Sequence, residues 1–189
     1  MQVHETGFSG LLVLEPRVFQ DERGFFLESY NRESFGKLGI RCEFVQDNHA
    51  YSRDSGVLRG FHFQTPPAAQ AKLVWVTRGA VLDVVVDLRK GSPTFGQWRH
   101  VILSAANFKR MFIPRGFGHA YVTIMPDTEF QYKVDAPYTP ECEGGIVWDD
   151  PDINMEWAVA LQGRAPVMSE KDKRLPKLAD FDSPFIYEE

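Results

Sequence analysis

Cysteine is scarce in this chain of 189 residues, and the two cysteines, Cys42 and Cys142, stand far apart in no CxxC or Cys/His arrangement. This excludes a disulfide framework and a structural zinc site, and it favours free thiols. The chain also lacks an apolar run of membrane-spanning length, and its start, MQVHETGFSGLLVLEP, lacks the features of a secretion signal. We therefore expect a soluble, cytoplasmic protein.

An excess of basic residues is missing as well. The net charge is -5 at pH 7 and the pI is near 5.6. Nucleic acids and anionic membranes attract proteins through a basic face, so neither is expected as a partner. A small anionic ligand is compatible with this composition, because a few arginines and lysines can line a pocket in an acidic protein.

Apolar material, by contrast, is plentiful. Hydrophobic residues make up 43% of the chain, with 15 Phe and 4 Trp, so a core can form without a disulfide or a metal. The length is that of one domain, and we expect a single domain over residues 1–189.

Many short apolar runs punctuated by Gly and Pro predict a β structure. Asn31 is expected to cap one short helix that ends at Gly39. A charged, helical tail is expected near the end, with Ser169 as its N-cap. The pattern predicts an all-β sandwich or barrel with a short N-terminal helix and a small C-terminal helical or irregular appendage. The strands are expected within 10–30 and across 42–52, 57–64, 71–88, 98–104, 110–125 and 128–134.

Strand alternation also predicts which candidate residues share a face of the sheet. Asp83 and Asp87 fall on one face of their apolar run. In an unbroken strand His62 and Gln64 also share a face, whereas Arg59 points the opposite way. If Arg59 and His62 reach one pocket, the strand must be irregular near Gly60, where glycine would permit a bulge.

Two short motifs resemble those of the cupin barrels: Gly56 followed by His62, and Pro114-x-Gly116-x-x-His119. In metal-binding cupins the first motif carries HxH and then a glutamate. Here Gln64 replaces the second histidine, and the run PPAAQA that follows has no acid. Two imidazoles are too few for a tight divalent site, so we expect no metal and no cofactor. A metal-dependent cupin enzyme is the alternative that this pattern disfavours.

An acid/base pair is a second interpretation of the same residues. His62 can take a proton near neutral pH, and Tyr132 can give one. A base and an acid on opposite sides of a planar intermediate would invert a stereocentre. The competing interpretation makes both residues core side chains with satisfied polar atoms. Taken together, charged residues on the expected strands, among them Arg59 and Lys72, suggest a charged ligand in the barrel, whereas each of them alone is better explained as a solvated side chain.

Longer motifs carry a family resemblance. The runs DERGFFLESYN, FVQDNHAYS, VLRGFHFQ, QAKLV, GAVLDVVVDLRKGSPTFGQW, IPRGFGHAYV, EFQYKV and SEKD resemble the dTDP-4-dehydrorhamnose 3,5-epimerase family, in its order and spacing. The resemblance implies a metal-free cupin-type jelly-roll barrel and a homodimer that shares strands near the N-terminus. It also implies inversion of C3 and C5 of dTDP-4-dehydro-6-deoxy-D-glucose through enolates, giving dTDP-4-dehydro-L-rhamnose.

The family's motifs also imply roles for individual residues. His62 resembles the base, with Asp172 on its Nδ1, and Tyr132 resembles the acid. Lys72, alone or with His119, resembles the group that stabilises the enolate oxygen, where one donor can contribute roughly 3 kcal/mol. The positions that match the nucleotide-sugar cleft are Arg23, Glu28, Gln46, Asp47, Asn48 and Arg59, with Tyr138 stacked on thymine.

Two alternatives stay open at this point. Relatives that share the same core invert only C3 or only C5, and no motif in this sequence separates them from a double epimerase. A cupin that binds sugar nucleotides without catalysis is the other alternative, although such a protein needs no acid/base pair. The segment 153–167 matches the family least well, so the place of Asp172 depends on an alignment across it.

Overall fold

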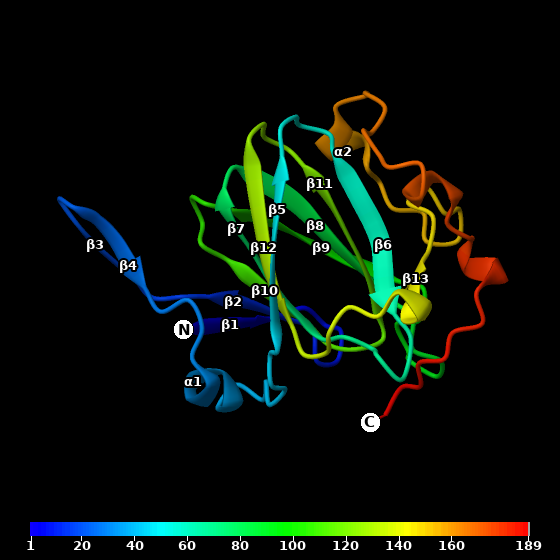
Figure 1. The fold of residues 1–189 in the computed structure, drawn as a ribbon, viewed down its shortest axis with the longest axis horizontal. Helices are drawn as coiled ribbons and strands as arrows, with labels where there is room; N and C mark the ends of the chain where they lie inside the picture. Colours follow the sequence, from blue (N-terminus) through cyan, green and yellow to red (C-terminus); the bar gives the residue numbers. More distant parts are fainter. Residues whose placement is uncertain (189) are drawn as a thin grey trace.

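Two antiparallel sheets face each other and form the body of the molecule in the computed structural model, which describes residues 1–188 (Figure 1). The six-stranded sheet has the order β1 (Gln2–Glu5), β2 (Leu12–Glu15), β10 (Arg110–Ile113), β7 (Lys72–Arg78), β12 (Thr128–Val134) and β5 (Gln46–Ser52). The five-stranded sheet has the order β13 (Glu143–Gly145), β6 (Leu58–Gln64), β11 (Phe117–Thr123), β8 (Ala80–Asp87) and β9 (Trp98–Ser104). This arrangement confirms the expected all-β class.

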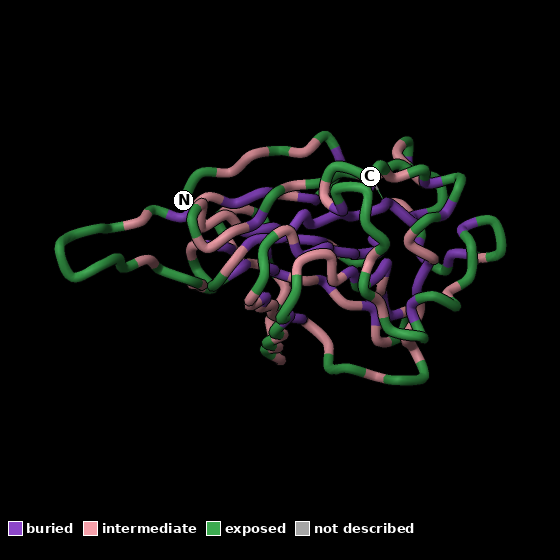
Figure 2. The backbone as a smooth tube through the Cα atoms, turned by 90° about the horizontal axis from the view of Figure 1, so that it is seen from above, coloured by how far each residue is buried: buried purple, intermediate pink, exposed green. Residues whose placement is uncertain are grey.

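The central strand β8 shows why its sequence is almost continuously apolar. Val81 and Val85 pack against the six-stranded sheet in one core cluster. Val84 and Val86, on the other face, belong to a second cluster that the C-terminal part of the chain covers. A strand buried on both faces needs apolar residues at nearly every position. Figure 2 accordingly shows the buried backbone running through the middle of the molecule.

The N-terminal region adds a hairpin and a short helix outside this body. The hairpin of β3 (Val18–Asp21) and β4 (Gly24–Leu27) projects away from the sheets and is exposed along most of its length (Figures 1 and 2). Helix α1 (Arg32–Gly36) begins where it was predicted, because Asn31 Oδ1 accepts a hydrogen bond of 3.0 Å from Ser34 N. It is shorter than expected: its α-helical part ends at Gly36, and the next residues form a turn that reaches Gly39.

One predicted strand proved to be two. Residues 110–125 form β10 and β11, which belong to different sheets. The chain turns at Pro114, which has no N–H to donate, and at Gly116, which has a φ of +92°. A side chain at Gly116 would place its Cβ 2.5 Å from Arg89 Cγ, so the two strands depend on this glycine.

The C-terminal part is irregular, as expected, with one short helix and three 3-10 turns. The expected helix over residues 169–180 is replaced by two of these turns, although Ser169 Oγ accepts a bond of 3.1 Å from Asp172 N in the predicted manner. The one helix and three 3-10 turns of this part are η1 (Pro140–Cys142), α2 (Ala158–Leu161), η2 (Asp172–Arg174) and η3 (Leu178–Asp180).

No helix among residues 1–188 is long and apolar enough to cross a membrane.

Candidate active site

A cavity of about 190 Å³ is lined by both sheets. Its walls combine an imidazole pair, two phenols, a lysine and an arginine with small and aromatic apolar groups. Residues from five strands, β5, β6, β7, β11 and β12, therefore meet in one place. The lining residues are Ala50, Arg59, His62, Lys72, His119, Tyr121, Phe130 and Tyr132.

His62 has a carboxylate partner, as the family motif implied. Its Nε2 lies 2.8 Å from Oδ1 of Asp172, a buried residue that begins η2. Burial raises the pKa of Asp172, but the hydrogen bond and charge of His62 outweigh it, and the net pKa lies below the ordinary value. The expected contact was on Nδ1. Because η2 brings the carboxylate to the Nε2 edge instead, Nδ1 is the nitrogen left to take a proton.

The strand that carries His62 is irregular where this was predicted. Its pairing with β11 shifts register between His119 and Tyr121, and Gly60 has a φ of +113°. A Cβ on Gly60 would lie 2.4 Å from the carbonyl oxygen of His119. Arg59 and His62 consequently line the same cavity, which confirms the structural prediction made from strand alternation.

Lys72 is held beside a buried Asp83–His119 pair. His119 Nε2 lies 2.9 and 3.0 Å from the two oxygens of Asp83. Burial lowers the pKa of Lys72 to about 8, against the opposing charges of Asp83 and Glu143. Burial also lowers the pKa of His119 and raises that of Asp83. A neutral His119 that donates Nε2–H to Asp83 keeps only the Nδ1 lone pair for a ligand.

Tyr132 lies on β12, on the opposite sheet from His62, and both line the cavity. Burial raises its pKa, and the nearby charge of Arg59 opposes this only in part. The phenol is therefore protonated at neutral pH and can serve as a proton donor.

The β5 residues divide between two faces. Gln46 and Asn48 share the face of Ala50, which lines the cavity, and Gln46 Nε2 donates to Asn48 Oδ1 at 2.9 Å. Asp47 points the other way, and its oxygens lie 2.7 and 2.9 Å from Lys133 Nζ. The side chain of Asp47 therefore does not face the cavity within this chain, because strand alternation turns it outward.

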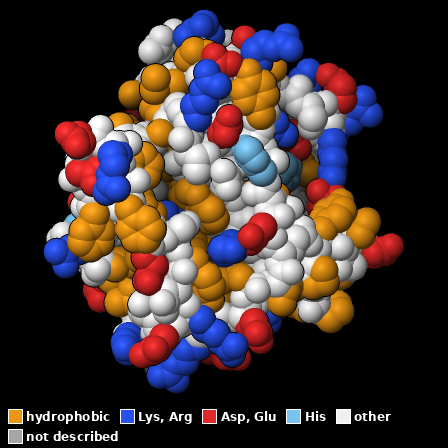
Figure 3. Space-filling view, turned by 60° about the vertical axis from the view of Figure 1, so that its left-hand side comes forward, with side chains coloured by type: hydrophobic (Ala, Val, Ile, Leu, Met, Phe, Trp, Pro, Cys, Tyr) orange, Lys and Arg blue, Asp and Glu red, His pale blue; other side chains and the backbone are white. Residues whose placement is uncertain are grey.

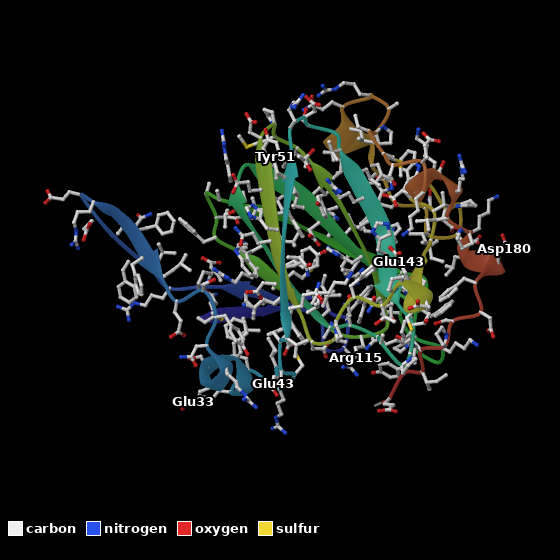
Figure 4. The ribbon with its side chains drawn as sticks, in the orientation of Figure 1. Glu33, Glu43, Tyr51, Arg115, Glu143 and Asp180 are labelled. Carbon is white, nitrogen blue, oxygen red and sulfur yellow. The ribbon has the colours of Figure 1, made fainter. Side chains whose placement is uncertain are left out.

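Tyr138 lies at an exposed edge of the site. Its backbone N–H donates to Gln46 Oε1 at 3.1 Å and its hydroxyl donates to Glu143 Oε2 at 2.8 Å. Glu143 belongs to β13, next to β6 (Figure 4), and also contacts Lys171. The exposed ring leaves a face available for stacking.

Arg23 and Glu28 do not meet the cavity in this chain. Arg23 lies at the tip of the projecting hairpin, where its Nη2 is 2.6 Å from Asp21 Oδ2. Glu28 follows the hairpin and accepts a bond of 3.1 Å from Asn31 Nδ2. Within one chain neither side chain lines the cavity, because the hairpin extends away from the body.

Gln64 has a structural role where a metal-binding cupin has histidine. Its Nε2 donates to the carbonyl of Ala68 at 2.7 Å, and its Oε1 accepts from Thr139 N at 2.7 Å. The side chain thus joins two loops near the site. Among residues 1–188 no three His, Cys, Asp or Glu side chains are grouped as a metal site would require.

Three residues at or beside the site were not proposed from the sequence: Asp83, Tyr121 and Glu143. Strand alternation contained a signal for two of them. It placed Asp83 on a defined face of its apolar run and Tyr121 on the face of His119. Glu143 gave no comparable signal, because the strand β13 is only three residues long.

A jelly-roll body with a histidine–carboxylate pair, a phenol and a buried lysine around one cavity defines an acid/base enzyme of the cupin type. The sequence model of a family described as dTDP-4-dehydrorhamnose 3,5-epimerase matches residues 5–180. The chain belongs to this family, and it is an epimerase.

Individual relatives support the assignment to this family. The chain is 49% identical to a dTDP-4-dehydrorhamnose 3,5-epimerase of Salmonella typhimurium, over 94% of this chain and 96% of that protein. A Legionella pneumophila epimerase solved with dTDP-4-keto-L-rhamnose is 41% identical, with a TM-score of 0.90 over 96% of this chain and 94% of that one. A 3'-monoepimerase of Streptomyces bikiniensis solved with dTDP-quinovose is 34% identical, with a TM-score of 0.85 over 93% and 87%.

Proposed function

We propose that the chain inverts C3 and C5 of dTDP-4-dehydro-6-deoxy-D-glucose and produces dTDP-4-dehydro-L-rhamnose. The observation that carries this proposal is the contact of 2.8 Å between His62 and Asp172 in a cavity that also contains Tyr132 and Lys72. Both reacting carbons flank the C4 ketone, so removal of either proton gives an enolate that one set of groups can stabilise. The chemistry needs no cofactor.

His62 acts as the base in this mechanism. Asp172 is ionised at neutral pH and accepts the Nε2–H of the imidazole, which fixes the tautomer and leaves the Nδ1 lone pair for the ring proton of the sugar. Tyr132, from the facing sheet and protonated at neutral pH, returns a proton to the opposite side of the enolate. Inversion follows because removal and return occur on different faces.

Lys72 stabilises the oxygen of the enolate. Its ammonium is largely removed from solvent at the wall of the cavity, where a preorganised charge acts more strongly than in water. His119 has a different task, because its Nε2–H is directed at Asp83. Its Nδ1 can only accept, so we assign it to a hydroxyl group of the sugar rather than to the enolate oxygen.

The forked donors of Arg59 suit a diphosphate. Arg59 is exposed at the edge of the cavity and has no carboxylate partner among residues 1–188. Gln46, Asn48 and Tyr138 extend the same edge, with the Tyr138 ring stacking on the base. A cavity of about 190 Å³ is smaller than the 300–1,000 Å³ usual for whole ligands. The hexose therefore occupies the cavity and the nucleotide lies outside it.

A homodimer would account for the residues that this chain does not bring to its own cavity. The hairpin exposes Phe19, Phe25 and Phe26 by 50%, 61% and 70%, and Figure 3 shows large hydrophobic side chains exposed among charged ones on the face turned forward with it. Apolar groups so exposed favour a protein partner. We propose that the hairpin docks on a second copy and supplies Arg23 and Glu28 to that copy's cleft.

Proton exchange tests the reaction directly. Wild-type protein with dTDP-4-dehydro-6-deoxy-D-glucose in D2O should incorporate deuterium at C3 and C5, followed by NMR, and His62→Ala should abolish this uptake. Undiminished uptake in His62→Ala would refute the proposal. Uptake and inversion at one carbon alone would identify a monoepimerase.

Mixed dimers test the shared site. Arg23→Ala and His62→Ala should each be nearly inactive alone, and light scattering should give the mass of two chains. Co-refolding equal amounts of the two variants should restore about a quarter of the wild-type sites if Arg23 acts in the partner's cleft, because half of the dimers are mixed and each mixed dimer has one complete site. A monomeric mass, or no recovery on mixing, would contradict the arrangement.

The cytoplasmic location stays a prediction. Both cysteines are free thiols, as is usual in a reducing compartment. Cell fractionation of a strain producing the tagged chain would check it.

A further inference from the structure

Tyr121 carries a buried hydroxyl that makes no hydrogen bond of acceptable geometry within residues 1–188. The residue is 6% exposed, and its hydroxyl is one of two buried side-chain polar atoms without a hydrogen bond among residues 1–188. The other is Nε of Arg110, which does not line the cavity. Buried hydroxyl groups almost always have a partner, because desolvation without one is unfavourable.

The neighbouring polar residues on the same face of β11 are satisfied. His119 contacts Asp83, and Thr123 Oγ1 donates to the carbonyl of Asp54 while accepting from Val57 N. Tyr121 lies between them and is the exception. A hydrogen-bond-like interaction with the Ser52 side chain lowers the pKa of Tyr121 against the larger effect of burial, but the contact does not have the geometry of a full hydrogen bond.

Packing alone does not explain a tyrosine at this position. The ring stacks on Phe130 at 4.1 Å between centroids and 15° between planes, and a phenylalanine ring could make the same stack. The hydroxyl adds only a cost to the free protein. A partner that arrives with the ligand would offset that cost.

The position of the hydroxyl indicates which part of the ligand it meets. Tyr121 lines the cavity that we assign to the hexose, and on β6 its register partner is Arg59, whereas that of His119 is His62. Tyr121 therefore lies beside His119 and His62 in the cavity, on the side toward Arg59, the cation that suits the diphosphate. Burial raises its pKa to about 12, so the phenol keeps its proton and can donate.

We propose that Tyr121 is a specificity-determining residue that donates a hydrogen bond to a hydroxyl group of the hexose, on the side of the sugar that faces Arg59. The proposal rests on the function proposed above. It makes sugar recognition partly independent of nucleotide recognition, because the contact is absent when dTDP binds alone.

Tyr121→Phe removes the hydroxyl and keeps the stacked ring, and Tyr187→Phe is the matched control. Tyr187 also keeps its ring contact with Arg89 when the hydroxyl is removed, and it does not line the cavity. Calorimetry with dTDP and with dTDP-glucose, thermal unfolding, and kcat and KM with the keto-sugar substrate complete the experiment.

For Tyr121→Phe we expect the Kd of dTDP-glucose to rise and kcat/KM to fall, each about tenfold, as for one lost hydrogen bond. The Kd of dTDP should stay within about twofold, and the Tm of the free protein should be unchanged or higher. Tyr187→Phe should match wild type in every measurement.

Three results would overturn the proposal. Equal weakening of dTDP and dTDP-glucose would place the contact on the diphosphate. Unchanged Kd and kcat/KM would mean that no contact forms, and a lower Tm of the free protein would mean that the hydroxyl has a partner within the protein. In each case His62→Ala would still abolish deuterium uptake if the proposed function holds, so the two failures are distinguishable.

Discussion

Replacing Asp172 by alanine and by asparagine separates two ways in which this carboxylate can serve His62. Asp172 Oδ1 lies 2.8 Å from His62 Nε2. Alanine removes this charge-assisted hydrogen bond, which is worth about 1.5–3 kcal/mol. At 1.36 kcal/mol per factor of ten, kcat should fall roughly 10- to 150-fold.

Asparagine should be worse than alanine, although it is the closer replacement in shape. The backbone N–H of Gly60 also acts on the Asp172 carboxylate, so an asparagine keeps its carbonyl oxygen toward Gly60 and turns its NH2 group to His62. An NH2 group donates to Nε2 and moves the ring proton to Nδ1, the nitrogen that must accept from the sugar. In a Ser-His-Asp triad the corresponding wrong tautomer costs about 10⁴ in kcat, and we expect a loss of that order.

Deuterium uptake at C3 and C5 in D2O measures the effect on proton removal itself. Both variants should retain the wild-type Kd for dTDP, which controls for folding of the site, and thermal unfolding controls for the rest of the chain. The reasoning fails if Asp172→Asn is as active as Asp172→Ala or more active, because the carboxylate would then not set the tautomer.

Three further predictions follow from the site. Since burial lowers the pKa of Lys72 to about 8, kcat/KM should fall above about pH 8 as the ammonium loses its proton, and Lys72→Met should remove this alkaline limb. Asp83→Asn removes a charge that raises the pKa of Lys72, so it should move the same limb to lower pH; an unmoved limb would exclude the coupling. Gly60→Ala should destabilise the fold by about 3 kcal/mol or more in urea unfolding, whereas the control Gly36→Ala, in open space on a helix, should stabilise it by about 0.5–1 kcal/mol.

The sequence predicted an element of the fold correctly where a single residue type determines the local backbone geometry. Asn31 caps α1 because its short side chain reaches Ser34 N, and alternation along β8 separates its two core faces. The division of residues 110–125 was missed because both halves are equally apolar. Only Pro114 and Gly116 mark the bend, and the close contact with Arg89 that requires a glycine there is a tertiary contact.

The site residues were proposed from motifs, and a motif does not say which chain or which face presents a side chain. Asp47 illustrates the second limit, since it follows Gln46 in the motif but faces away from the cavity to Lys133. Arg23 illustrates the first under the proposed dimer, because the hairpin that carries it leaves the body of its own chain. In both cases the decisive information is the direction of a strand in three dimensions.

The residue that most directly connects the fold to the chemistry is a glycine. On a regular strand Arg59 and His62 would lie on opposite faces, and the cation proposed for the diphosphate could not share a cavity with the proposed base. At Gly60 the backbone takes a φ of +113°, and the carbonyl oxygen of His119 occupies the space of a Cβ. The irregularity turns both side chains into one cavity, so under the proposed roles a residue without chemistry of its own sets the distance between the nucleotide-binding and proton-transferring groups.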